Sequence, residues 1–417
     1  MKKLILSLAV PFLLLSCEQI ELADTGQADT PQTATLTLQF QSEEALTVTR
    51  AADDPTIKNL NIYLFNPTIN LTKHYYLSGQ QRITIPALPA GTYELYAVAN
   101  KGADLGEQTP AQLDALRQTI SAAGDSAAGW IMAARQTIQL TGPATVPVKL
   151  VRTAAKINLT VTIPATSATA AISLVSVRLE QAPRGVTLFG DSKVTTADDR
   201  LDYPAVSATG QAFTGSFYML ENLQGTAAAI SDPTQKDPTR APAHATRIHI
   251  TAQSGSKKID YFIYPGANTT SDFNIERNRQ YNITVNIQGA DTYDWRVSTA
   301  DLYVSDFDSS YEVGATATAD LRLTCYNNAD NAYTLTYRPS SASGTFKLDA
   351  QTLSPGVPVA FTPTGIMPAT ISYTQTSTGP ADLQIDVTDR YGYTLTKNLT
   401  TTFKKYITLT LSVTPTK

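Results

Sequence analysis

The segment Lys156–Ile163, with the sequence KINLTVTI, decides the fold class of this chain. Its apolar residues Ile157, Leu159, Val161 and Ile163 alternate strictly with polar ones. A period of two places successive side chains on opposite faces of an extended strand, whereas an amphipathic helix repeats every 3.6 residues. The segment therefore predicts a β-strand with one buried face and one solvated face.

Similar segments lie on both sides of this one. Leu36–Phe40, Asn59–Phe65 and Tyr93–Val98 precede it. Those that follow, separated by turn-rich connections, are Ile172–Leu179, Thr214–Leu220, Thr246–Ala252, Asp260–Tyr264, Tyr281–Ile287, Asp301–Val304, Ala319–Cys325, Ala332–Tyr337, Ala369–Tyr373, Ala381–Val387 and Tyr393–Thr400. Short strands at this spacing are typical of β-sandwiches. We expect an all-β protein made of tandem β-sandwiches, with the last one immunoglobulin-like.

One helix is expected, between Thr109 and Gly124. Thr109 is a good N-cap, Pro110 suits the first helical position, and Gln112 completes a capping box. The apolar face of this helix would comprise Leu113, Leu116 and Ile120. Gly124 would end the helix, which we expect to cover a sheet face or rim.

The N-terminus predicts export. Residues 1–17 read MKKLILSLAVPFLLLSC: two lysines, a short apolar run and small residues before Cys17. This is a secretion signal, too short to span a bilayer as a mature helix. Its end, LLSC, is similar to a bacterial lipobox, in which the signal is cut before the cysteine and that cysteine receives lipid. The alternative is an ordinary secreted protein in which Cys17 is incidental.

Length and composition limit the other possibilities. A chain of 417 residues can hold two to three domains. Charged residues make up only 16 % and the net charge is −4, which argues against a nucleic-acid-binding protein. Lipidation of Cys17 would leave Cys325 as the one remaining cysteine, so no disulfide is expected. The expected division is a signal peptide (1–16), a tether (17–33), and three sandwiches (34–155, 156–292 and 293–417).

No pattern of catalytic or metal-binding residues stands out. The three histidines, His74, His244 and His249, lack a metal-binding spacing, and we expect His244 and His249 at the surface. Cys325 would be a packed core thiol. The acidic run Asp306–Glu312 lacks the spacing of a calcium loop and predicts a solvated turn. Residues Ser231–Pro242 predict a long exposed loop. We expect no enzyme activity, no cofactor and no metal.

Several short motifs together resemble fimbrillin-type fimbrial subunits of Bacteroidales. In the first domain they are Leu60–Phe65 (LNIYLF), Leu88–Tyr93 (LPAGTY) and Ala97–Asn100 (AVAN), and Val151–Ile157 (VRTAAKI) is similar to the domain junction. In the second domain they are Phe217–Asn222 (FYMLEN), Tyr264–Asn268 (YPGAN), Ile275–Tyr281 (IERNRQY) and Val285–Gly289 (VNIQG). The resemblance covers about Thr35–Gly289. From about Trp295 onward the chain is similar only to immunoglobulin-like domains.

The resemblance implies a route of assembly. Such subunits reach the outer membrane as surface-exposed lipoproteins, and an arginine-specific protease cuts after the first strand. A donor strand from another fimbrial subunit then fills the groove that is left, by β-strand addition. Here Leu36, Leu38 and Phe40 would belong to the displaced strand, and cleavage would follow Arg50, making Ala51 the new N-terminus. The alternative is that Arg50 is a surface arginine and the first strand stays, as in a lipid-retained anchor subunit.

The C-terminal segment leaves two interpretations open. Ile407, Leu409, Leu411 and Val413 alternate with threonine and serine, as a donor strand requires, but the same pattern suits the last strand of the third domain. An extra C-terminal domain favours a tip or accessory component of a fimbrium, active in adhesion to a host or bacterial receptor. A different class is a surface glycan-binding lipoprotein, with an exposed aromatic such as Trp130 or Trp295 stacking on sugar.

Overall fold

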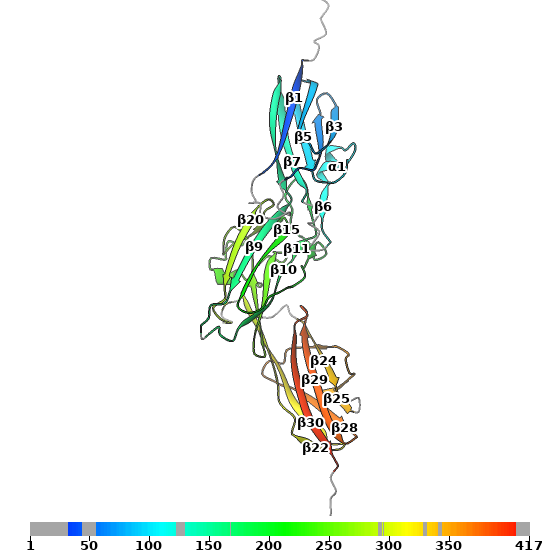
Figure 1. Cartoon of the computed structure of the whole chain (residues 1–417), viewed down its shortest axis with the longest axis vertical. Helices are drawn as coiled ribbons and strands as arrows, with labels where there is room; N and C mark the ends of the chain where they lie inside the picture. The colour runs from blue at the N-terminus through cyan, green and yellow to red at the C-terminus, as the bar shows by residue number, and fades with distance from the viewer. Residues whose placement is uncertain are drawn as a thin grey trace, which may run out of the picture.

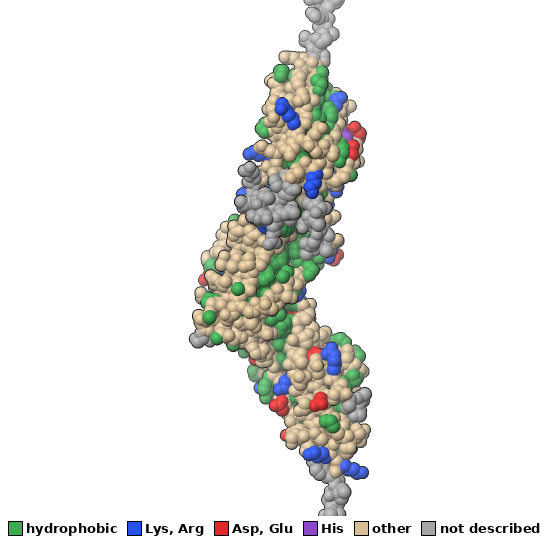
Figure 2. All heavy atoms as spheres, in the orientation of Figure 1, with side chains coloured by type: hydrophobic (Ala, Val, Ile, Leu, Met, Phe, Trp, Pro, Cys, Tyr) green, Lys and Arg blue, Asp and Glu red, His purple; other side chains and the backbone are tan. Residues whose placement is uncertain are grey.

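The structure is a computed structural model that describes residues 32–43, 56–121, 130–166, 168–290, 294, 296–327, 332–340 and 344–405. Three β-sandwich units follow one another along a long molecule (Figure 1). The first described residues lie at one end of the molecule and the last ones at the other. The expected all-β fold with tandem sandwiches is confirmed. In the view of Figure 2, charged side chains are sparse and scattered.

The first unit packs two layers around one core. Its strands are β1 (Thr33–Ser42), β2 (Asn59–Asn66), β3 (Leu71–Ser78), β4 (Arg82–Pro89), β5 (Gly91–Ala99), β7 (Met132–Leu140) and β8 (Ala144–Arg152). Their order is β3-β2-β5-β7-β8-β1-β4. Strands β7 and β8 pair only where Met132 and Ala133 meet Arg152 and Val151, and this short join connects the two layers. Apolar residues from both layers, among them Leu36, Leu64 and Leu95, form one buried cluster.

The one α-helix in the described part of the chain begins as expected but is shorter than predicted. Helix α1 (Pro110–Asp114) has Thr109 as its N-cap, and the capping box with Gln112 is present. The chain then leaves the helix and forms β6 (Arg117–Thr119), which pairs with β12 (Gly185–Thr187) of the second unit. The expected continuation toward Gly124 is therefore wrong: strand pairing competes for the main chain of residues 117–119. Ile120 consequently packs in the core of the second unit, and Gly124 lies outside the described residues.

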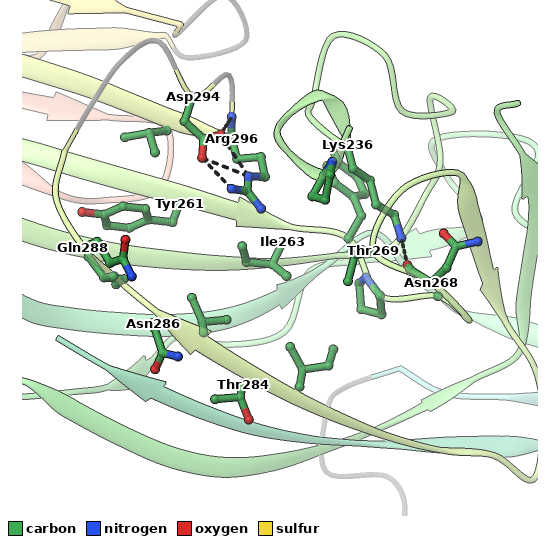
Figure 3. Close-up of a pocket in the computed structure, with 18 of the residues that line it drawn as sticks. Lys236, Tyr261, Ile263, Asn268, Thr269, Thr284, Asn286, Gln288, Asp294 and Arg296 are labelled. Atoms are coloured by element: carbon green, nitrogen blue, oxygen red, sulfur yellow. Dashed lines mark hydrogen bonds and ion pairs between the residues drawn. The ribbon is translucent and has the colours of Figure 1, made fainter. Parts of the chain in front are cut away.

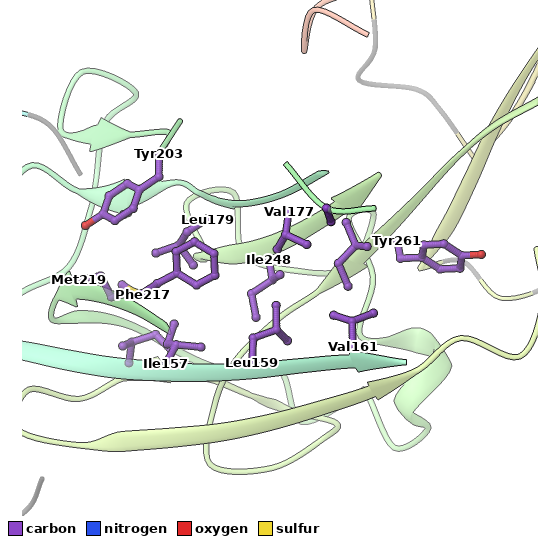
Figure 4. Packing of buried hydrophobic residues seen from close by; sticks show 14 of the residues in the cluster. Ile157, Leu159, Val161, Val177, Leu179, Tyr203, Phe217, Met219, Ile248 and Tyr261 are labelled. Carbon is purple, nitrogen blue, oxygen red and sulfur yellow. The ribbon is translucent and has the colours of Figure 1, made fainter. Parts of the chain in front are cut away.

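The second unit contains the strand that decided the fold class. The sheet β15-β9-β20 faces the strands β14-β10-β17-β18. Its elements are β9 (Ala154–Thr162), β10 (Ser173–Glu180), β11 (Ala182–Pro183), β13 (Arg200–Leu201), β14 (Val206–Ser207), β15 (Ala212–Leu220), β16 (Asn222–Thr226), β17 (Arg247–Ser254), β18 (Lys257–Ile263), β19 (Asp272–Ile275), β20 (Gln280–Asn286) and the 3₁₀ turn Pro233–Gln235. Ile157, Leu159 and Val161 of β9 point toward Ile248 and Val177, as expected (Figure 4).

The expected long exposed loop, Ser231–Pro242, is only partly exposed. It contains the 3₁₀ turn, and the side chains of Lys236 and Asp237 are buried. The carboxylate of Asp237 accepts a hydrogen bond from the Thr239 N–H at 2.7 Å, and Lys236 Nζ donates to the Asn268 carbonyl at 2.9 Å. Local hydrogen bonds thus allow polar residues of this segment to be buried, which composition alone does not reveal.

The third unit shares a sheet with the second. Its strands are β21 (Val297–Val304), β22 (Ser310–Glu312), β23 (Thr316–Tyr326), β24 (Tyr333–Pro339), β25 (Gly344–Leu348), β26 (Gln351–Leu353), β27 (Val359–Phe361), β28 (Ala369–Gln375), β29 (Gly379–Asp389) and β30 (Thr394–Lys404). Strand β21 pairs with β18 on one side and β23 on the other, so a nine-stranded sheet runs through both units. Within the third unit, the sheet β22-β30-β29-β24-β27 packs against this nine-stranded sheet, and the core of the third unit lies between the two. Cys325 is half-buried and packs against this core, as expected of a core thiol.

Candidate strand-exchange site

Strand β1 contributes a complete row of side chains to the first core. Leu36 and Leu38 are fully buried, and Phe40 is 3 % exposed. Gln39 and Gln41, on the other face of the strand, are exposed, because side chains alternate along a strand, while Thr37 on that face is buried. Burying side chains of this size contributes roughly 1.5–3 kcal/mol each. The first unit without β1 would therefore expose an apolar groove and lose several kcal/mol.

Strand β1 is also hydrogen-bonded on both sides. It runs antiparallel to β4, with Leu38 opposite Ile83, and parallel to β8, with Leu38 opposite Val146. It lies between these two strands in the sheet order. Removing β1 would leave two facing edges with unpaired N–H and C=O groups. Such a slot matches an extended peptide in both shape and hydrogen bonding.

The other residues of the predicted processing and donor sites lie outside the described part of the chain. These are Cys17, Arg50, Ala51 and the tail residues Ile407, Leu409, Leu411 and Val413. The last described residue after β1 is Glu43, whose N–H donates to the Leu150 carbonyl at 2.9 Å. Arg50 thus stands, in sequence, in the connection between β1 and β2.

The described residues include no group of three or more His, Cys, Asp or Glu side chains that could hold a metal ion. Trp130, one of the two aromatics considered for sugar stacking, is 5 % exposed and packs in the core of the second unit. Trp295 lies outside the described residues. Among described residues, no helix is long and apolar enough to cross a membrane.

A buried ionic cluster on the second unit was not expected from the sequence. His249 is 1 % exposed, so its expected surface position is wrong; His244 is half-buried. The His249 ring lies between two carboxylates, with Nδ1 2.8 Å from Glu180 Oε1 and Nε2 2.7 Å from Asp260 Oδ1. Arg247 Nε donates to Glu180 at 2.8 Å, and Lys258 Nζ lies 2.8 Å from Asp260.

The charges in this cluster stabilise one another. Burial by itself raises the pKa of Glu180, but the hydrogen bond from His249 and the charges of His249 and Arg247 outweigh burial and lower the pKa to about 2. Burial lowers the pKa of His249, but Asp260 and Glu180 outweigh it, and the net pKa is raised. The imidazolium therefore donates to both carboxylates, as a buried charge requires.

The third unit covers this cluster. Lys258 Nζ forms an ion pair with Asp389, and the rings of Tyr391 and His249 pack edge to face at a centroid distance of 4.5 Å. Arg178 donates to the Tyr391 carbonyl at 3.1 Å. The segment Asp389–Tyr393, between β29 and β30, thus closes the polar face of the second unit. In the sequence, the only sign of this cluster is that a histidine and four other charged residues fall on the outward face of three strands. Only the tertiary contact shows that this face is covered.

The comparisons with known proteins concern the first two units. Residues 34–170 match the family described as major fimbrial subunit protein (FimA), and this match includes all of β1 except Thr33. This part of the chain is therefore similar to the FimA family. Residues 217–285 match a domain family of unknown function, DUF4906. No curated protein matches the chain. This similarity supports the function of a fimbrial or adhesion-type subunit.

Solved structures that match part of the chain come from Porphyromonas, Bacteroides and Parabacteroides species. A fimbrilin (FimA) of Porphyromonas gingivalis is 17 % identical, with a TM-score of 0.46, and the alignment covers 62 % of this chain and 91 % of that one. A candidate cell adhesion protein of Bacteroides eggerthii is 21 % identical, with a TM-score of 0.44, covering 62 % and 87 %. A fimbrial assembly protein of Parabacteroides distasonis is 13 % identical, with a TM-score of 0.35, covering 64 % and 95 %.

Proposed function

We propose that this FimA-type chain is a structural subunit of a surface fimbrium, assembled by strand exchange at the slot of β1. The chain is exported as a lipoprotein on Cys17, reaches the outer membrane, and is cut after Arg50 by an arginine-specific protease. Cleavage releases β1 together with the lipid. A strand from another fimbrial subunit then fills the slot between β4 and β8.

The environment of β1 supports this proposal most strongly. Leu36, Leu38 and Phe40 are almost fully buried, yet β1 is followed in sequence by a connection that contains a single arginine, Arg50. A strand bonded on both sides cannot leave without exposing two edges and an apolar groove. That exposure supplies the driving force for accepting a replacement strand.

The third unit favours a tip or accessory position. It is joined to the second unit by a shared sheet and by the ionic cluster, so it is an integral part of the subunit. A tip component must accept a strand but has no need to donate one. In this position the third unit would contact a receptor on a host or bacterial surface.

Replacing Arg50 with alanine tests the proposal. We expect Arg50→Ala to abolish incorporation into fimbriae, measured by immunoblotting of sheared fimbriae, while the lipidated precursor accumulates in the outer membrane. Arg82→Ala is the matched control, since Arg82 is an exposed arginine on the neighbouring strand β4. Normal incorporation of the Arg50→Ala chain would refute cleavage at this site and would favour a lipid-retained anchor subunit.

A further inference from the structure

A groove on the second unit has an apolar lining. This β20 groove is a cavity of about 840 Å³ between the end of β18 and strand β20. Ile263 of β18 and Ile283 and Val285 of β20 line it, and all three are only half-buried although they pack against the core of the unit. Binding sites for small molecules are typically of this size and mostly apolar. The β20 groove can therefore shield an apolar ligand from water.

The β20 groove is elongated, and its two ends differ. Figure 3 shows Lys236 and Asn268 at one end, with Tyr261 and Gln288 at the other. Lining residues follow the chain from Asn282 to Gln288, a distance of roughly 20 Å at roughly 3.3 Å per residue. This length suits an extended, chain-like ligand that has one end beside Lys236.

The ammonium group of Lys236 is incompletely paired. Lys236 is 3 % exposed. Among the described residues, the Asn268 carbonyl at 2.9 Å is its one hydrogen-bond acceptor, and the Phe273 ring lies 5.0 Å from Nζ. An ammonium has three N–H donors, and a buried charge is normally paired. The other charged residues of the lining, Asp294 and Arg296, already pair with each other at 2.6 Å.

The protonation of Lys236 suits an anionic ligand. Burial lowers the pKa of Lys236 to about 8, and the nearby charge of Asp272 opposes this shift. The ammonium is therefore still charged at neutral pH, with its charge only partly compensated. The carboxylate of Asp272 would also repel a ligand that carries two negative charges, so the site favours a carboxylate over a phosphate.

We propose that the β20 groove binds a long-chain fatty acid, with its carboxylate on Lys236 and its acyl chain against Ile263, Ile283 and Val285. The ligand would complete the pairing of a buried cation and cover half-buried apolar side chains in one step. The groove is separate from the slot of β1 and from the third unit. This binding activity therefore goes beyond the proposed fimbrial function and does not depend on it.

Binding of dodecanoate tests the inference. The target is the full chain with Cys17→Ser, so that the proposed lipid on Cys17 cannot compete. We expect saturable binding in isothermal titration calorimetry at dodecanoate concentrations below micelle formation. Shorter chains should bind more weakly, by up to roughly four-fold for each methylene removed, because each buried methylene contributes to binding. Dodecyltrimethylammonium, which has the same chain length and a positive head group, should not bind.

Replacing Lys236 with methionine tests the contact with the head group. Methionine keeps much of the apolar side chain and removes the charge, so Lys236→Met should weaken dodecanoate binding at least about ten-fold. Cooperative thermal denaturation would show that this variant is folded. Lys73→Met is the matched control, because Lys73 is an exposed lysine on β3 of the first unit, and it should leave dodecanoate binding unchanged.

The comparison of head groups on the parent chain needs no further variant, so the inference stays testable even if Lys236→Met fails to fold. No binding of dodecanoate, or equal binding to the folded Lys236→Met chain, would overturn it. Equal binding of dodecyltrimethylammonium would also overturn it, as nonspecific apolar adsorption. Tighter binding of dodecyl phosphate than of dodecanoate would overturn the carboxylate assignment. None of these outcomes bears on the release of β1, which the N-terminus of the fimbrial chain tests separately.

Discussion

At the residue scale, the ionic cluster around His249 determines how the second unit meets the third. The expected strand Thr246–Ala252 is present as β17, and its Ile248 and Ile250 pack in the core. His249 was expected to face water, because the outer face of a half-buried strand is usually solvated. Docking of Tyr391 covers that face. This contact lies 142 residues away in sequence and leaves no local signal.

The pKa of Glu180 leads to a prediction of stability against pH. Because folding lowers this pKa from 4.5 to about 2, the folded state binds fewer protons than the unfolded state between these values. The stabilisation of the folded state by the Glu180 carboxylate is present above pH 4.5 and is lost as the pH falls toward 2. It amounts to roughly 3 kcal/mol. Glu180→Gln should lower the free energy of unfolding at pH 6 and flatten its decline in acid, as measured by urea denaturation.

The exposed carboxylate of Glu312 provides the control for this experiment. Glu312 lies on β22 with its side chain exposed, so Glu312→Gln should reproduce the wild-type dependence on pH. Identical acid profiles for wild type and Glu180→Gln would show that the cluster contributes no pH-dependent stability.

At the element scale, most strands could be predicted because their side-chain periodicity agrees with their burial. Strand β9, for example, ends within one residue of the predicted Ile163. Helix α1 shows where local signals fail. Thr109, Pro110 and Gln112 correctly set its beginning, but pairing of β6 with β12 ends it early. A partner strand from another unit cannot be read from the helical pattern.

The connection between β29 and β30 yields a prediction about the joint between units. Lys258 and Asp389 are each 1 % exposed at the side chain, so removing one charge leaves the other buried and incompletely paired. Breaking such a pair costs roughly 3–5 kcal/mol. Asp389→Asn should lower the free energy of unfolding by an amount of this order and increase the spread of interdomain distances in small-angle X-ray scattering.

Asp382→Asn is the matched change on the same strand, because Asp382 is exposed. It should leave both the stability and the scattering profile unchanged. A normal scattering profile for Asp389→Asn would mean that the shared sheet alone, through β18 and β21, fixes the joint.

At the scale of the whole molecule, the sequence was sufficient to predict three successive sandwiches but not how they are joined. The change of sequence pattern after Gly289 indicated a third unit. Nothing in that pattern indicated that β21 would continue the sheet of the second unit. The candidate site was predictable in part. The alternation of Leu36, Leu38 and Phe40 indicated a buried face, whereas pairing of β1 with both β4 and β8 depends on long-range contacts.

The N-terminus of the mature protein tests the central claim most directly. Intact-mass and peptide mass spectrometry of the chain purified from sheared fimbriae would identify it. Release of the first strand predicts a chain that begins at Ala51 and carries no lipid. A fimbrial chain that begins at lipidated Cys17 and retains Leu36–Phe40 would contradict strand exchange at the slot of β1.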